Sequence, residues 1–89
     1  MFRVRWEGRA LRELADMWIR ANSTEQRAIT EASHKIEQRL RADPESESES
    51  RPNGRRITFV PPLAVTFRIE AGGQLVSVLQ VRMFRRRKS

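Results

Sequence analysis

The chain of 89 residues contains no cysteine, no tyrosine and a single histidine, His34. Without cysteine it can form neither a disulfide nor a thiolate metal site, and it has no thiol nucleophile. One histidine supplies neither a metal-binding pair nor a catalytic triad. We therefore expect no metal ion and no cofactor, and any chemistry has to come from other residue types.

Long apolar runs are also missing. No stretch approaches the ~20 apolar residues that a membrane-spanning helix needs, and residues 1–10 lack the apolar middle of a signal peptide. The length suits one domain, and the lack of cysteine suits a reducing compartment. We predict a single domain over residues 1–89, located in the cytoplasm and without a membrane partner.

Acidic residues are almost absent from the second half of the chain. Residues 51–89 carry nine Lys or Arg against one acidic residue, Glu70, whereas residues 1–50 carry nine against ten. The formal net charge of +7 therefore arises in the second half. A one-sided positive field favours a polyanion or an acidic protein as partner. The alternative is that the arginines only keep a small protein soluble.

Two periodicities divide the beginning of the chain. Phe2, Val4 and Trp6 alternate with arginines, which is the period-2 pattern of a half-buried strand. After Gly8, apolar residues recur at spacings of three and four and predict an amphipathic helix. Its apolar stripe comprises Ala10, Leu11, Leu14, Met17, Trp18 and Ala21.

A second helix follows a break near residue 22. Ser23 with Gln26 three residues later indicates a capping box at its start. The helix must end near Asp43, because Pro44 disfavours helical geometry in the residue before it. Its apolar face carries Ile29, Ala32, Ile36 and Leu40.

Strand patterns return after a Glu/Ser-rich segment that we expect to be an exposed loop, one edge of which could join the next strand. Three strand-like runs cover residues 55–60, 64–70 and 74–84. Pro61-Pro62 separates the first pair, and Gly72-Gly73 supplies the positive φ that a tight hairpin between the second pair needs. The high apolar content of the last run indicates a strand covered on both faces and hence the central strand of the sheet.

The order of these elements is strand, helix, helix, strand, strand, strand. It predicts an α+β fold in which a helical hairpin packs on one face of a four-stranded, mostly antiparallel sheet. The opposite, concave face would be left for a ligand, and the arginines of the second half gather there.

Neighbouring strands would bring several of these arginines into one groove. Guanidinium groups bind phosphate in bidentate fashion, and they can also stabilise the charge of a phosphoryl-transfer transition state. Phe84 lies between Arg82 and Arg85 and is placed to stack on a base. We expect Phe59 and Phe67, in contrast, in the core. The basic residues concerned are Arg55, Arg56, Arg68, Arg82, Arg85, Arg86, Arg87 and Lys88.

The ordered elements resemble the RelE/ParE toxins of bacterial type II toxin–antitoxin systems. The resemblance covers nearly the whole chain. It is carried by the helix LRELADMWIRA, by Leu40, Asp43 and Pro44 in IEQRLRADP, by the strand PLAVTFRI, and by VSVLQV running into basic residues. None of these motifs is unique to the family, but their order and spacing agree.

The resemblance implies a small, basic, cytoplasmic toxin that a cognate antitoxin holds inactive. It implies one of two targets: the translating ribosome, where members of one branch cleave messenger RNA, or DNA gyrase, which members of another branch block. Should this chain act as an endoribonuclease, we assign contacts to the transition state to Arg68, Arg82 and Arg85. We assign contacts to nucleic acid to Arg55, Arg56, Phe84, Arg86, Arg87 and Lys88.

Some positions depart from the family's pattern for RNA cleavage. RNase members often have arginine where this chain has Ala64, and many have histidine or tyrosine where it has Met83 and Phe84. Neither Met83 nor Phe84 can transfer a proton, and arginine is a poor base at neutral pH. The alternative to a toxin is therefore a non-catalytic RNA- or protein-binding domain, including a toxin homologue that has lost its activity.

Overall fold

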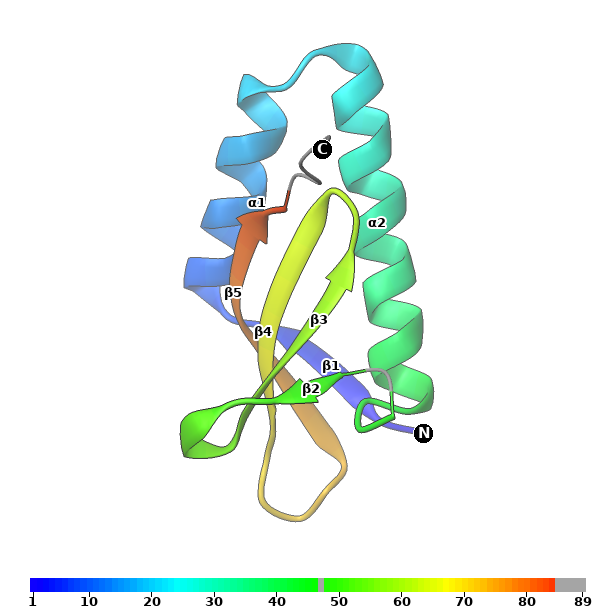
Figure 1. Cartoon of the computed structure of the whole chain (residues 1–89), viewed down its shortest axis with the longest axis vertical. Helices are drawn as coiled ribbons and strands as arrows, with labels where there is room; N and C mark the ends of the chain where they lie inside the picture. The colour runs from blue at the N-terminus through cyan, green and yellow to red at the C-terminus, as the bar shows by residue number, and fades with distance from the viewer. Residues whose placement is uncertain (47, 85–89) are drawn as a thin grey trace, which may run out of the picture.

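A computed structural model describes residues 1–46 and 48–84 of the chain. Its elements in chain order are β1 (Arg3–Trp6), α1 (Gly8–Arg20), α2 (Ser23–Ala42), β2 (Glu49–Ser50), the 3₁₀ turn η1 (Pro52–Gly54), β3 (Arg55–Val60), β4 (Leu63–Ile69) and β5 (Leu75–Met83). Both helices pack against the same face of a single sheet, with α1 to the left and α2 to the right in the view of Figure 1. The predicted α+β fold with a helical hairpin is confirmed.

The sheet has five strands in the order β1-β5-β4-β3-β2, one more than predicted. The additional strand is β2, which lies within the expected Glu/Ser-rich loop and pairs with Arg56 and Ile57 of β3. β1 runs parallel to β5, and all other neighbours are antiparallel. β5 is an interior strand between β1 and β4, but the central strand is β4 and not β5 as predicted, because β2 adds a strand on the far side of β3.

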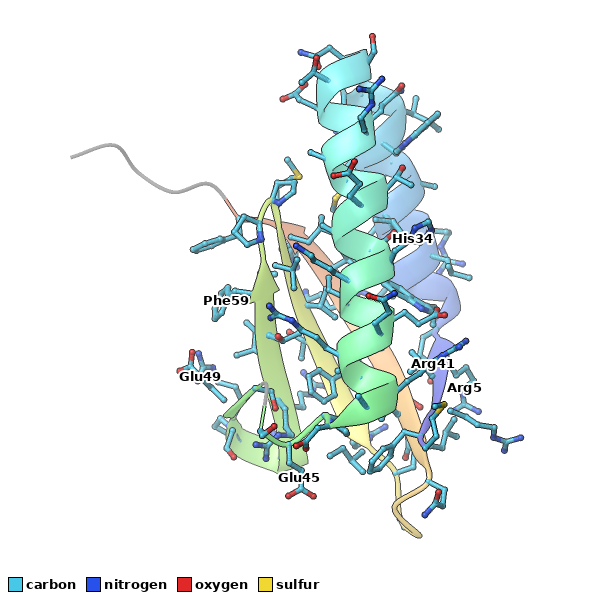
Figure 2. All side chains as sticks on the ribbon, turned by 90° about the vertical axis from the view of Figure 1, so that its right-hand side faces the viewer. Arg5, His34, Arg41, Glu45, Glu49 and Phe59 are labelled. Carbon is cyan, nitrogen blue, oxygen red and sulfur yellow. The ribbon has the colours of Figure 1, made fainter. Side chains whose placement is uncertain are left out.

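The core lies between the helices and one face of the sheet, as the alternation of each strand requires. α2 packs against β3 and β4, α1 packs against β5, and Phe67 is fully buried in this core, as predicted. The buried apolar residues of this cluster are Ala10, Ile29, Ala32, Ile36, Leu40, Val60, Leu63, Val65, Phe67, Val76, Val78 and Val81. Figure 2 shows the helices on one side of the strands and an uncovered face on the other.

The start of α2 differs by one residue from the prediction. Asn22, not Ser23, is the N-cap: its Oδ1 accepts from the Glu25 amide at 2.8 Å, and Glu25 Oε1 accepts from the Asn22 amide at 3.0 Å. The Gln26 side chain instead donates to the Trp18 carbonyl at 2.9 Å. The reason is that Asn22 is still extended (ψ 174°), so that the first helical residue is Ser23.

Two other predicted boundaries are confirmed. α2 ends at Ala42 with Asp43 as its C-cap, directly before Pro44. The β4–β5 hairpin has positive φ at Gly72 (97°) and Gly73 (74°), a conformation that side chains with a Cβ rarely adopt.

The apolar stripe of α1 splits between two surfaces. Ala10 is buried, and Leu14, Met17 and Ala21 pack at the edge of the core. Leu11 and Trp18, however, are 50% and 42% exposed on the outside of the helical hairpin. Among residues 1–46 and 48–84, no helix is long and apolar enough to cross a membrane.

Candidate nucleic-acid interface

The face of the sheet that the helices leave uncovered is the candidate site, and we call it the open face. Strand alternation places on it every second residue of β1, β3 and β4, and the register adds residues of β5, where a shift opposite Thr66 and Phe67 interrupts the alternation. Phe59 marks this face in Figure 2, where its side chain points away from both helices. The open face comprises Arg3 and Arg5 of β1, Arg55, Ile57 and Phe59 of β3, Ala64, Thr66 and Arg68 of β4, and Ser77, Gln80 and Arg82 of β5.

Three arginines lie in one register across the strands at one end of the open face. Arg55 of β3 is directly opposite Arg68 of β4, Arg68 is opposite Ser77 of β5, and Ser77 is level with Arg5 of β1. We call Arg5, Arg68 and Arg55 the arginine row. Neighbouring strands are about 4.8 Å apart, so the row spans four strands. Two of the predicted site residues, Arg55 and Arg68, therefore lie side by side.

The carboxylate of Glu70 lies beside the arginine row. Glu70 follows directly after β4, and its Oε2 is 3.6 Å from Arg68 Nε. The Ser77 hydroxyl bonds to the carboxyl of Glu70, and this hydrogen bond, with Arg68 and Arg5 nearby, lowers the pKa of Glu70 below its usual value. Arg5 Nη2 donates to Ser77 Oγ at 3.1 Å and is 3.5 Å from Glu7 Oε1. Ser77 itself is fully buried beneath these side chains.

Arg82 lies at the other end of the open face. It is opposite Ala64, which in turn is opposite Phe59. The ring of Phe84 packs on that of Phe59 at a centroid distance of 4.9 Å and a tilt of 53°. The Phe84 amide donates to the Pro62 carbonyl at 2.6 Å, which fixes the end of β5. An arginine thus stands beside a half-buried aromatic pair.

The two ends of the open face are separate. Ala64, opposite Arg82, and Arg68 are four positions apart along β4, about 13 Å at ~3.3 Å per residue. Arg82 is therefore not part of one cluster with Arg55 and Arg68. The sheet is also twisted, so that Phe59 and Arg5 point in different directions in Figure 2.

Arg56 has a different environment from the other predicted site residues. It is opposite Phe67, whose side chain is in the core, so it does not lie on the open face. Its Nε donates to Ser48 Oγ at 2.7 Å, its Nη1 to Ser50 Oγ at 3.0 Å and its Nη2 to the Glu45 carbonyl at 2.9 Å. The guanidinium group is thus committed to holding the segment between α2 and β3.

Phe59 corrects the prediction that placed it in the core. It is half-buried on the open face, because the register aligns it with Ala64 and because Val60, the next residue, points into the core. The predicted site residues Arg85, Arg86, Arg87 and Lys88 lie outside the described residues.

Sequence reasoning missed Arg5 and Ser77 of the open face and also Glu70, which follows directly after β4. Alternation in β1 gave the signal that Arg5 is on the polar side of its strand. The parallel pairing that places it beside β5 could not be read from any local pattern. Within the described ranges, no three His, Asp or Glu side chains are close enough to hold a metal ion.

A second surface lies on the outside of the helical hairpin, and we call it the helical groove. It is an open depression of about 490 Å³ with a nearly apolar lining. Ile19 is 70% exposed there, and Trp18 Nε1 donates to Thr30 Oγ1 at 3.2 Å across the two helices. The lining residues are Leu11, Leu14, Ala15, Trp18, Ile19, Ile29, Thr30 and Ser33.

Comparisons by sequence find no relative: no family model matches the chain, and no curated protein matches it. Solved structures do match. A chain of the toxin–antitoxin complex RelBE2 from Mycobacterium tuberculosis superposes with a TM-score of 0.73 at 18% identity, over 92% of this chain and 90% of that chain.

Two further structures agree with this match. A chain of the chromosomal ParDE toxin–antitoxin system from P. aeruginosa has a TM-score of 0.72 at 17% identity, over 96% and 98% of the two chains. The isolated E. coli RelE toxin has a TM-score of 0.65 at 15% identity, over 99% and 89%. The chain therefore has the fold of the RelE and ParE toxins, as the resemblance predicted.

Proposed function

We propose that this protein is a growth-inhibiting toxin of a type II toxin–antitoxin system, acting in the cytoplasm on messenger RNA at the ribosome. One observation carries the proposal: the open face presents arginines at both ends and an aromatic pair beside Arg82. Arginines bind the backbone of single-stranded RNA, and an exposed ring stacks on its bases. The shared fold supports the toxin class.

The chemistry of this face is binding and charge stabilisation. Arg82 and Arg68 can hold phosphate and stabilise charge on a phosphoryl group. His34 lies on α2, across the sheet from Phe59 (Figure 2), and the chain has no tyrosine. RNA cleavage, if the toxin performs it, therefore rests on positioning the 2′-hydroxyl and on Arg68, Arg82 and Arg85 rather than on a histidine or tyrosine.

An acidic antitoxin is the proposed partner. The chain's net charge of +7 speeds the encounter with an acidic protein. The helical groove offers the apolar surface on which a protein partner can bury side chains. Active face and partner surface would then lie on opposite sides of the molecule.

The first experiment is induced expression in a bacterial host, with soluble protein confirmed by immunoblot. We expect growth arrest for the wild type and its loss for Arg82→Gln, because the latter removes a phosphate contact. Arg27→Gln, an exposed arginine of α2, is the matched control and should remain toxic. Primer extension on ribosome-bound message should show cuts that depend on Arg82. Normal growth of cells that contain abundant soluble wild-type protein would refute the proposal that it is a toxin.

DNA gyrase is the second candidate target. The observation that favours it is the lack of any histidine or tyrosine on the described open face, since a gyrase inhibitor needs no acid–base residue. A supercoiling assay with purified gyrase decides between the targets. Inhibition of supercoiling without cuts in messenger RNA would replace the ribosome as the proposed target. If neither inhibition of supercoiling nor cleavage is observed, the alternative of a non-catalytic binding domain is favoured.

A further inference from the structure

The arginine row holds the one acidic residue of the second half of the chain. Glu70 has no counterpart among residues 51–89, all of whose other charges are positive. Its carboxylate nevertheless accepts from the buried Ser77 hydroxyl and faces Arg68 and Arg5. This end of the open face therefore already binds one anionic oxygen group, the carboxylate of Glu70.

This place has more positive charge than Glu70 neutralises. Arg55 and Arg68 are directly opposite each other in an antiparallel pair, an arrangement that costs free energy for like charges. Glu7 lies 3.5 Å from Arg5 and Glu70 lies 3.6 Å from Arg68. Arg55 has no acidic partner among residues 1–46 and 48–84. A second anionic group would relieve the remaining repulsion.

We propose that the arginine row and Ser77 form a second phosphate-binding subsite for single-stranded RNA, and that Glu70 occupies this subsite in the free protein. A backbone phosphate replaces the carboxylate of Glu70 when RNA binds. The inference rests on the proposed RNA-binding function of the open face and adds a second contact point to it. This point is about 13 Å along β4 from Ala64, the residue opposite Arg82.

Phosphate fits the subsite better than the carboxylate does. It has more acceptor oxygens, and guanidinium groups from two or three strands can reach it together. Ile57 and Thr66 lie between the two ends and are only half-buried, so unpaired bases can lie against this part of the face. Because a rigid duplex cannot splay its bases onto the sheet, the ligand is single-stranded.

The test measures binding of a fluorescent single-stranded RNA of about 12 nucleotides, within the usual range of site sizes, by anisotropy at several salt concentrations. Arg68→Gln should raise Kd by roughly tenfold and lower the salt slope by about 0.7. Glu70→Gln should lower Kd by roughly two- to fivefold, because the built-in competitor is gone. A merely structural ion pair would instead give weaker binding for both variants.

Controls separate this inference from the proposal on which it rests. Arg27→Gln should bind like the wild type, and thermal unfolding confirms that each variant is folded. If Arg82→Gln weakens binding but Arg68→Gln and Glu70→Gln do not change it, the second subsite is refuted and RNA binding stands. If the wild type binds no RNA even at low salt, RNA binding fails as well. Equal affinity for a duplex of the same sequence would refute the single-strand assignment.

Discussion

Arg56 shows how the position of one residue in the sheet decides what its side chain does. Arg55 and Arg56 are adjacent and chemically identical, and sequence patterns assigned both to nucleic-acid binding. Alternation sends them to opposite faces: Arg55 lies on the open face, whereas Arg56 turns to the residues before β3. Its donors satisfy two serine hydroxyls and a backbone carbonyl there.

We predict that Arg56→Ala destabilises the fold by about 1–2 kcal/mol, because several charge-assisted hydrogen bonds are lost at a partly exposed site. Arg55→Ala should change the free energy of unfolding by less than about 0.5 kcal/mol. Urea denaturation of the two variants gives both values. An equal effect of the two substitutions would contradict the assignment of Arg56 to a structural role.

The start of α2 shows how the path of the chain, rather than a local motif, decides which residue caps a helix. Two overlapping sequences could each form a capping box there, Ser23 with Gln26 and Asn22 with Glu25. Side-chain chemistry does not separate them, because Ser and Asn cap helices about equally well. What separates them is the course of the chain out of α1, which leaves Asn22 extended and frees Gln26 to bond the Trp18 carbonyl.

We predict that Asn22→Ala lowers the free energy of unfolding by about 1 kcal/mol, the usual cost of losing a cap. Ser23→Ala, the control, should be within about 0.5 kcal/mol of the wild type. The two midpoints of chemical denaturation can be compared directly. A larger loss for Ser23→Ala would restore the cap that the sequence pattern suggested.

On the scale of the whole molecule, a positively charged surface and an apolar surface lie on different sides. The open face carries the arginines, and the helical groove carries Leu11, Trp18 and Ile19 on the side of the helices. The sheet and the core lie between them. A protein partner bound in the groove would therefore leave the proposed RNA-binding residues of the open face uncovered.

We predict that Ile19→Glu abolishes neutralisation by the antitoxin while toxicity remains, because a buried charge at the groove is costly for the complex. Gln38→Glu makes the same charge change at an exposed site of α2 outside the groove and should be rescued normally. The measurement is growth during co-expression with the protein encoded beside the toxin. Full rescue of Ile19→Glu would place the antitoxin elsewhere.

Local patterns predicted much of this fold because they report on short-range physics. Alternation in β1, β3, β4 and β5, the apolar faces of the helices and the breaks at Pro44 and Gly72-Gly73 are each set by a few neighbouring residues. β2 was not predicted as a separate strand, only as an edge of the loop that could join the next strand, because two residues within an acidic, serine-rich stretch carry no strand signal of their own. Their pairing with β3 supplies the structure.

The sequence by itself determined the order of β1, the two helices and the three long strands, most of the core and the location of positive charge in the second half. Only the tertiary structure decided which arginines share a surface. The parallel register of β1 with β5 brings Arg5 to Ser77, which is 72 residues away, and the antiparallel register of β3 with β4 sets Arg55 against Arg68. Such contacts depend on strand order and register, which no local periodicity encodes.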